Sequence, residues 1–313
     1  MKMMTNKQKK YNSIKIIVIA VSLIPVILLS FFIYINGFFG ISAKSVYSFF
    51  GISEFSSCAD SYPLSVHFID VGCGDSILIK CGDKTALIDT GNFSLNGKTR
   101  YYLEHSGIKK LDLFIATHTD SDHIGDFKSV ADNFKIDNIW INKPGNTDTS
   151  KQTESEKIFF KTISDKNINI TTPKCGGYPF GDANLQVLSS SGHYNNDNSL
   201  VIKLTYKNIS YLFMGDAGEN TENTLINKGV NLSSTVLKVS HHGSSMGTSK
   251  KFLKCVSPKY AIISAGIENK YLPNRNTVER IRMTGAKILR TDIDGNVILA
   301  TDGKTLSAFC ENT

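Results

Sequence analysis

The residues best suited to chemistry are two histidines and two aspartates within one six-residue stretch, HTDSDH at 118–123. An apolar run at 111–117 precedes them and predicts a buried strand, and the residues that follow, to about Phe134, have a helical pattern. The four side chains therefore lie on one strand-to-helix turn. Imidazole and carboxylate groups bind zinc or manganese at catalytic sites with open positions. The turn carries enough ligands for two metal ions: His118, Asp120, Asp122 and His123.

The competing interpretation of this stretch is a polar surface loop in which Asp122 caps the next helix. A single histidine or a pair of aspartates would leave that interpretation the better one. Four ligand-type residues directly after a buried strand favour the metal site.

The net charge of +7 is unevenly distributed along the chain. Five of the 35 basic residues and none of the 28 acidic residues lie in the first 43 positions, so the remainder is nearly neutral. The basic character is mainly a signal of membrane topology, and charge alone does not argue for nucleic-acid binding.

Residues 16–35 contain no charged side chain, and as a helix this segment is long enough to cross the hydrocarbon core of a membrane. The lysines before them predict a cytoplasmic N-terminus and an exported remainder. A signal peptide cleaved near Ala43 is the alternative, although its apolar region would be shorter. We therefore expect a basic cytoplasmic segment at 1–15, a transmembrane anchor at 16–35, a linker at 36–63 and a folded domain at 64–313, outside the cytoplasm and attached to the cell membrane by a single span.

Six scattered cysteines without a C-x-x-C pair do not resemble a zinc ribbon, and they leave one or two disulfides open. Alternation and apolar runs predict two groups of strands interleaved with helices, which indicates an α+β domain of two sheets packed face to face with helices outside. Strands are expected at 64–70, 76–80, 85–89, 111–117, 138–142, 184–189, 199–206, 209–214, 235–239, 260–264 and within 287–309. Helices are expected at 98–106, 152–165, 219–228, after 245, and to about Met283 with Asn276 as the N-cap.

Several motifs in order give the chain a resemblance to a known family. They are FIDVGCGDS from Phe68, LIDTG from Leu87, HTDSDHIGD from His118, and, further along, NDNSLVIKL from Asn196, YLFMGDAG from Tyr211, LKVSHHGSS from Leu237 and RTDIDGNV from Arg290. Over about 64–308 the chain resembles metallo-β-lactamase-fold hydrolases, in particular the C-terminal hydrolase domain of ComEC-type DNA-uptake competence proteins and its stand-alone relatives. The resemblance implies a four-layer αβ/βα sandwich with two divalent metal ions, zinc or manganese, at one edge.

The resemblance also implies ligand roles. His118 and Asp120 would bind the first metal, Asp122 and His123 the second, and Asp216 would bridge both. Either histidine after Ser240 could complete the second metal, with His241 preferred as the ligand and His242 as its support. A further ligand of the first metal would be His193 or, alternatively, Asn196 or Asn198. His193 could equally be an incidental loop residue.

Two positions depart from the pattern of the family. Cys73 stands where the family turn has Gln, which changes a supporting contact. Tyr-Leu-Pro-Asn at 271–274 replaces a Tyr-Gly-His-Pro sequence, so Pro273 occupies the place of a histidine. Loss of that histidine would alter the rate or the substrate, or would weaken the second metal if it were a ligand.

The chemistry expected from these residues is metal-assisted hydrolysis, in which two ions activate water and stabilise charge on a phosphoryl or carbonyl oxygen. Asp122 is a candidate catalytic residue, and Lys238, Ser244 and Ser245 are close enough in sequence to the ligands to position an anion; strand-end solvation and turn capping are their alternative roles. A phosphodiesterase acting on DNA is the first hypothesis. The others are a hydrolase of wall or membrane phosphoesters or of lactams or lactones, and an inactive surface binding module.

Overall fold

A computed structural model of the chain describes residues 55–93, 97–142, 152–190 and 199–312. The expected cytoplasmic segment, the expected transmembrane helix, and the candidate ligands His193, Asn196 and Asn198 lie outside these residues. Within the described ranges, no helix is long and apolar enough to cross a membrane. The compact unit begins at Phe55, and a 3-10 helix (Phe55–Ala59) packs through Ala59 against Ile298 and Ala300. The end of the expected linker is therefore part of the folded unit.

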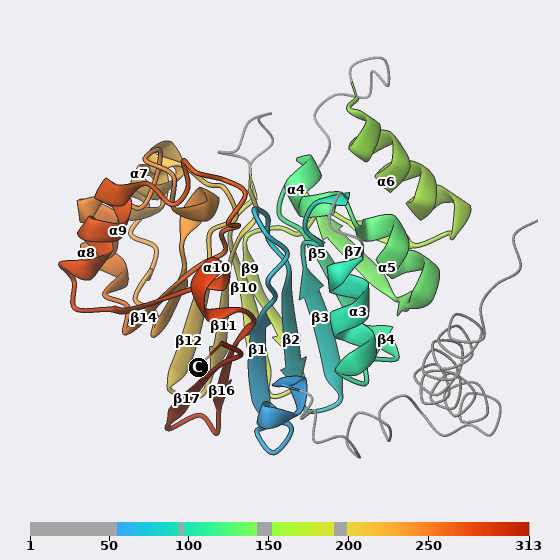
Figure 1. The fold of residues 1–313 in the computed structure, drawn as a ribbon, viewed down its shortest axis with the longest axis horizontal. Coiled ribbons are helices and arrows are strands. Elements are labelled where there is room, and N and C mark those ends of the chain that lie inside the picture. Colours follow the sequence, from blue (N-terminus) through green and yellow to red (C-terminus); the bar gives the residue numbers. More distant parts are fainter. Residues whose placement is uncertain (1–54, 94–96, 143–151, 191–198, 313) are drawn as a thin grey trace, which may run out of the picture. The chain divides into compact units, whose positions relative to one another are not determined.

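Two large sheets form the centre of the domain (Figure 1). The first is eight-stranded, in the order β17 (Leu306–Cys310), β16 (Val297–Thr301), β1 (Leu64–Phe68), β2 (Ile77–Cys81), β3 (Lys84–Ile88), β5 (Leu113–Ala116), β7 (Asn138–Ile141) and β8 (Asn169–Thr171). The second is seven-stranded, in the order β15 (Lys287–Arg290), β14 (Tyr260–Ile263), β13 (Val236–Lys238), β12 (Ile209–Phe213), β11 (Val201–Tyr206), β10 (Ala183–Ser189) and β9 (Gly176–Phe180). β4 (Lys110–Leu111) and β6 (Lys135–Ile136) form a separate pair.

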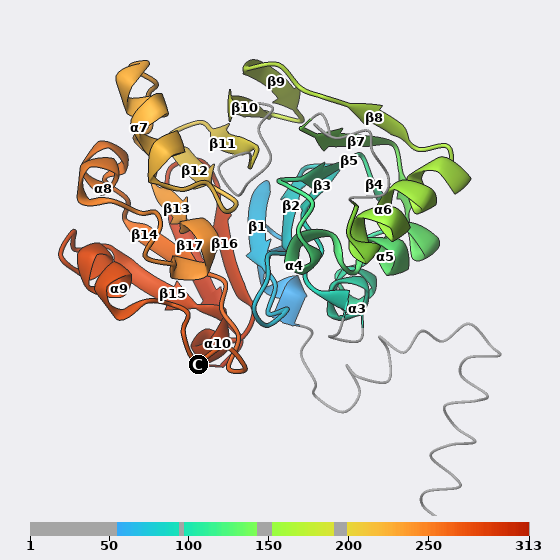
Figure 2. The ribbon, with the colours of Figure 1, turned by 90° about the horizontal axis from the view of Figure 1, so that it is seen from above.

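Helices cover the outer faces of both sheets, and Figure 2 shows the four layers from above. The first sheet is covered by α3 (Lys98–His105), α5 (Phe127–Asn133) and α6 (Glu154–Asp165), with the one-turn helix α4 (Ser121–Ile124) at its end. The second sheet is covered by α7 (Glu219–Asn227), α8 (Lys250–Val256) and α9 (Arg275–Arg282). A further one-turn helix, α10 (Thr291–Asp294), precedes β16. The expected αβ/βα sandwich is therefore the observed architecture.

The layers are held together by three buried apolar clusters. One lies between the two sheets and includes Phe68 and Phe213, whose ring centroids are 6.4 Å apart. Another joins the first sheet to its helices through Phe114, Phe127 and Phe159. The third joins the second sheet to its helices. Inward-facing residues of each strand fill the central cluster and outward-facing residues fill the lateral ones, because side chains alternate between the faces of a strand.

Most expected elements are present, and the differences have local causes. The run at 111–117 is divided into β4 and β5, because Asp112 turns its carboxylate back to accept hydrogen bonds from Thr85 and Lys84. The prediction that Asn276 is the N-cap of this helix is wrong. Asn274 caps α9, and its side chain accepts a hydrogen bond from the backbone N–H of Asn276. All six cysteines are free thiols.

Candidate metal centre

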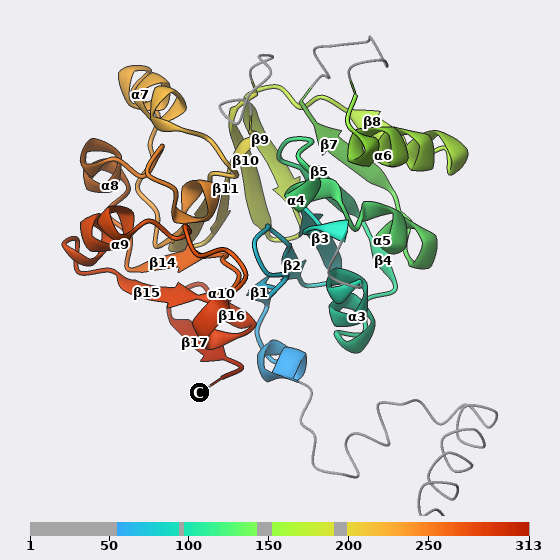
Figure 3. The same ribbon diagram turned by 45° about the horizontal axis from the view of Figure 1, so that its top comes forward.

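The edge of the sandwich gathers the ends of strands from both sheets. β3, β5 and β7 are parallel in the first sheet, and β12 to β15 are parallel in the second. Since the carboxyl ends of parallel strands meet at one edge, the loops after them converge there, as do ligand sites in α/β sheets generally. Figure 3, with this edge turned forward, shows α4 between the two outer helical layers. At Gly74 a Cβ would lie 2.5 Å from the carbonyl oxygen of Asp122, so the loop after β1 approaches α4 only because this residue is glycine.

His118, His123 and Asp216 form a buried group across the two sheets. His118 follows β5, His123 lies in α4 and Asp216 follows β12. Nε2 of His118 lies 3.8 Å from Oδ2 of Asp216, and Nε2 of His123 lies 3.3 Å from Oδ1. One atom from each of the three residues can be chosen so that all lie within 4.8 Å of one another. This group unites residues that are almost a hundred positions apart in the chain.

The donor set of this group fits a metal ion. Two ligands bound at about 2.0–2.1 Å in tetrahedral geometry lie roughly 3.3 Å apart. The separations of 3.3 and 3.8 Å between the imidazole nitrogens and Asp216 match this value better than they match hydrogen bonds. Among the described residues, Nε2 of His118 and Nε2 of His123 have no hydrogen-bond partner, although both atoms are buried. A buried polar atom without a partner costs free energy, which an ion between these groups would offset.

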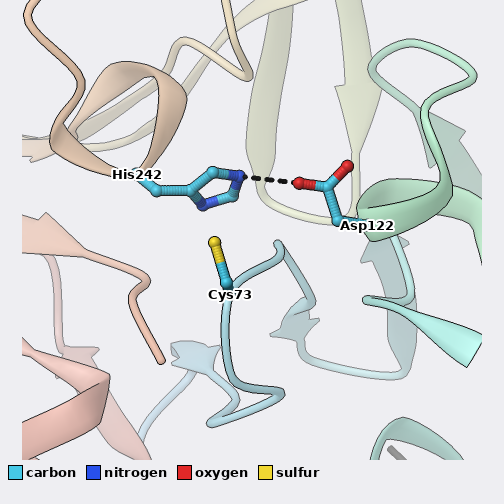
Figure 4. Close-up of side chains that lie close together, drawn as sticks. All are labelled: Cys73, Asp122 and His242. Atoms are coloured by element: carbon cyan, nitrogen blue, oxygen red, sulfur yellow. Dashed lines mark ion pairs between the residues drawn. The ribbon is translucent and has the colours of Figure 1, made fainter. Parts of the chain in front are cut away.

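A second group lies beside the first and consists of Cys73, Asp122 and His242 (Figure 4). Nε2 of His242 is 3.3 Å from Oδ2 of Asp122 and 3.8 Å from Oδ1 of Asp216. The thiol of Cys73 points toward both side chains and completes a set of donor atoms within 4.8 Å of one another. His242 is 1% exposed, and its Nε2 also has no hydrogen-bond partner in the described part of the chain. Asp216 thus touches both groups, which fits the bridging role expected of it.

A layer of buried groups beneath the ligands orients them. Oδ2 of Asp89 accepts a hydrogen bond from Nδ1 of His123 at 2.8 Å, so Nε2 faces Asp216. Asp89 also accepts hydrogen bonds from the backbone N–H and the hydroxyl of Thr117. The carbonyl of Ser264 is 3.1 Å from Nδ1 of His242 and orients this ring in the same way.

The backbone at His241 and His242 is strained. His241 and His242 have φ angles of 49° and 51°, and Gly243 follows with a φ of 79°. Two consecutive non-glycine residues in the left-handed region are costly, about 1–3 kcal/mol each. The strain turns both imidazoles toward Asp216 from the end of one strand, which a regular strand could not do because its side chains alternate.

The charges in the site are strongly coupled. Burial raises the pKa of Asp216, but the imidazoles of His123, His242 and His118 lower it by a larger amount, so this pKa lies well below its ordinary value. Burial lowers the pKa of His123, and Asp216 and Asp89 outweigh this effect and raise it well above its ordinary value. Burial also lowers the pKa of His242, but Asp122, followed by Asp216 and Asp75, outweighs this effect and raises it. Burial raises the pKa of Asp122, but His242 and His123 lower it to about 2. Burial raises the pKa of the Cys73 thiol.

The structure brings the other expected ligands to the rim of the site. Oδ2 of Asp120 lies 3.6 Å from Nε2 of His118, and its side chain is 58% exposed. Nε2 of His241 lies 3.6 Å from Oδ2 of Asp216, with its side chain 23% exposed. On the side of Asp122, His242 and not the preferred His241 provides the nitrogen. The expected division of ligands is therefore altered: His241 lies toward the group of His118, and His242 lies toward Asp122.

Lys238 and Ser244, expected to position an anion, are placed differently. Nζ of Lys238 is fully buried and lies 2.7 Å from Oδ1 of Asp75, which makes it a support beneath the site and corrects the expected role. The hydroxyl of Ser244 accepts a hydrogen bond from the backbone N–H of Met246 and stabilises the turn after the histidines. Ser245 is exposed.

The sequence interpretation missed Asp75 and Asp89 as supporting groups and Cys73 as a donor. Asp89 directly follows β3 and precedes Gly91, whereas Asp75 ends the glycine-containing turn before β2. Both lie within motifs on which the resemblance to the family rests. Pro273, in place of the histidine of the relatives, lies against Gly243, where an added Cβ would come within 2.6 Å of its side chain. This position is therefore next to the strained histidine turn.

The fold and this donor set define the class of protein. Residues 69–267 match the family model of the metallo-beta-lactamase superfamily, and the chain belongs to that superfamily. It is a superfamily hydrolase related to competence proteins. It is 31% identical over 255 residues to ComE operon protein 3 of Bacillus subtilis and 30% identical over 235 residues to competence protein ComA of Neisseria gonorrhoeae. The matches cover 74% and 72% of this chain but only 32% and 30% of those proteins. The chain therefore spans about a third of the length of the curated relatives it matches.

The fold recurs in solved structures of low sequence identity. The structure of CmlA, a diiron beta-hydroxylase from Streptomyces venezuelae, superposes with a TM-score of 0.54 at 10% identity, covering 77% of this chain and 54% of that one. At this identity the likeness supports the fold alone.

Proposed function

We propose that this protein is a phosphodiesterase that hydrolyses DNA with two divalent metal ions, and that residues 16–35 anchor it in the membrane with the catalytic domain outside the cytoplasm. The observation that carries the proposal is the buried carboxylate of Asp216 between two groups of imidazole and carboxylate donors. Paired ions of this kind activate water and stabilise the attacking and leaving oxygens of a phosphoryl displacement. The similarity to proteins named for competence supports a nucleic-acid substrate, and the uncharged segment behind basic residues supports the topology.

The residues that would hold the ions divide into buried ones and ones at the rim of the site. The buried nitrogens of His118, His123 and His242 would hold the ions together with Asp122 and Asp216. Asp120 and His241 lie at the rim, 3.6 Å from His118 and Asp216 respectively, and would complete the ligands of the ion beside His118, on the side open to the phosphodiester. Zinc or manganese would suit this mixture of imidazole and carboxylate.

The test is hydrolysis of single-stranded DNA, double-stranded DNA and a bis-aryl phosphodiester by the purified full-length chain, supplied with zinc or manganese. We expect Asp216→Asn to lose bound metal and more than about a hundredfold in activity. Mutating only the hydrogen-bond partners of metal ligands already lowers metal affinity or activity by about 10–100-fold, and Asp216 is itself expected to be a ligand. Asp165→Asn, which changes an aspartate on α6 with 59% side-chain exposure, is the matched control and retains activity. A wild-type chain with two bound ions that cleaves none of these substrates would refute the phosphodiesterase and direct the search to wall or membrane phosphoesters.

A further inference from the structure

Cys73 lies in the metal centre although the family turn to which its loop corresponds carries Gln. Its sulfur, one carboxylate oxygen of Asp122 and one ring nitrogen of His242 all lie within 4.8 Å of one another. Figure 4 shows the thiol directed into the space between the other two side chains. No disulfide engages this cysteine.

His242 supplies an independent indication of a ligand at this place. The residue is 1% exposed, its Nδ1 is occupied by the carbonyl of Ser264, and its Nε2 has no hydrogen-bond partner among the described residues. The same Nε2 lies 3.3 Å from Asp122, the separation roughly expected of two ligands on one tetrahedral ion. A buried nitrogen directed at a carboxylate and a thiol is therefore explained by a cation bound among the three.

The loop that carries Cys73 is held in place from the opposite side. The backbone N–H of Cys73 donates to Oε1 of Glu268 at 2.6 Å, and Nδ2 of Asn269 donates to Sγ of Cys73 at 3.3 Å. A hydrogen bond donated to sulfur orients the lone pairs that remain. Gly266 leaves no room for a side chain here, since a Cβ would lie 2.4 Å from the backbone nitrogen of Cys73. The sulfur is thus positioned by a fitted loop.

We propose that Cys73 is a thiolate ligand of the second metal, so that Cys73, Asp122 and His242 form a zinc-selective site beside the bridging Asp216. The inference rests on the two-metal centre of the proposed function. The Cys73 thiol would lose its proton to water when an ion is held here, and its sulfur would then serve as an anionic ligand. Thiolate favours zinc, whereas carboxylate and water suit manganese, so the two positions of the centre differ in metal preference.

The test uses cobalt as a spectroscopic substitute for zinc in the metal-stripped full-length chain. We expect a near-ultraviolet thiolate-to-cobalt charge-transfer band in the wild type and in Cys255→Ser, an exposed-cysteine control, and none in Cys73→Ser. Bound cobalt without this band, or a band that survives in Cys73→Ser, would overturn the inference while leaving the metal centre intact. Failure of the wild type to bind any cobalt would overturn the proposed function as well.

Two further measurements address selectivity and folding. Cys73→Ser is expected to lower zinc affinity by at least about tenfold and manganese affinity by less, as read by chelator competition. In the wild type, zinc is expected to slow alkylation of Cys73 by at least about tenfold, with Cys255 unchanged, as mapped by mass spectrometry. The alkylation assay needs no variant, and equal rates with and without zinc would contradict thiolate ligation.

Discussion

Asp89→Asn tests whether metal binding depends on the orientation of His123. Oδ2 of Asp89 accepts hydrogen bonds from Nδ1 of His123 at 2.8 Å and from the hydroxyl of Thr117 at 2.7 Å, while Oδ1 accepts from the backbone N–H of Thr117. Asparagine keeps one acceptor oxygen and replaces the other with an NH₂ group. If the oxygen stays on the backbone of Thr117, the NH₂ group faces Nδ1–H of His123 and donor opposes donor.

The expected loss follows from the role of Asp89 beneath the ligand. Removing a partner that orients a metal-binding histidine reduces affinity by about 10–100-fold. This corresponds to about 1.4–2.7 kcal/mol, at about 1.4 kcal/mol for each tenfold. Because His123 and Asp89 are both fully buried, solvent cannot replace the lost bond, and the upper part of the range is expected.

The assay is competition for zinc between the full-length chain and a chromophoric chelator, with urea unfolding of the metal-free proteins measured in parallel. Asp165→Asn again serves as the control. A zinc affinity of Asp89→Asn within a factor of about two of the wild type, in a protein that still unfolds cooperatively, would refute the idea that Asp89 orients a metal ligand.

Three other perturbations have definite signs. The raised pKa values of His123 and His242 mean that metal must displace protons from them, so zinc content at fixed free zinc is expected to fall as pH falls below those values; a constant content across acid pH would contradict this. Lys238→Met leaves the buried carboxylate of Asp75 without its cation and is expected to lower the free energy of unfolding by about 3–5 kcal/mol in urea, whereas a change below about 1 kcal/mol would be inconsistent with a buried pair. Burial, followed by the charge of a nearby lysine, lowers the pKa of His67 to about 3. The unfolded chain therefore binds the additional proton first as pH falls through about 6.5, and the wild type is expected to lose about 2 kcal/mol more stability between pH 7 and 5 than His67→Asn.

The sequence predicted the sandwich well because its strands are apolar and its turns carry glycine and polar residues. β1, β2 and β3 are short runs of this kind, and their ends were expected within about two residues. β8 and β9 were not anticipated, because Asn169–Thr171 and Gly176–Phe180 are largely exposed and lack an apolar alternation. Their pairing is determined by neighbouring strands and not by local pattern.

The candidate site was predictable where ligands are close in sequence and less so where the fold brings them together. The stretch HTDSDH at 118–123 was recognisable because four ligand-type residues lie within six positions. Asp216 was recognisable because it lies in the motif YLFMGDAG. The choice between His241 and His242 could not be made from spacing, because both residues adopt left-handed backbone conformations that no strand or helix pattern anticipates. Lys238 was misplaced for a related reason: the residue lies in a buried strand, and only the opposing loop reveals that Asp75 is its partner.

The division of ligands between two sheets links the metal centre to the fold. His118 and His123 belong to the first sheet, whereas Asp216 and His242 belong to the second, and their mutual distances of 3.3–3.8 Å exist only when the sheets are packed together. Without a cation, this arrangement confines carboxylates beside imidazoles, and Nε2 of His118, His123 and His242 has no hydrogen-bond partner in the part of the chain that the structure describes. A bound ion would therefore stabilise the contact between the sheets at the edge where the apolar cluster ends, and the free energy of metal binding would become part of the free energy of folding. Buried charge at this edge is compensated across the two sheets, since Lys238 pairs with Asp75 and His242 lies 3.3 Å from Asp122.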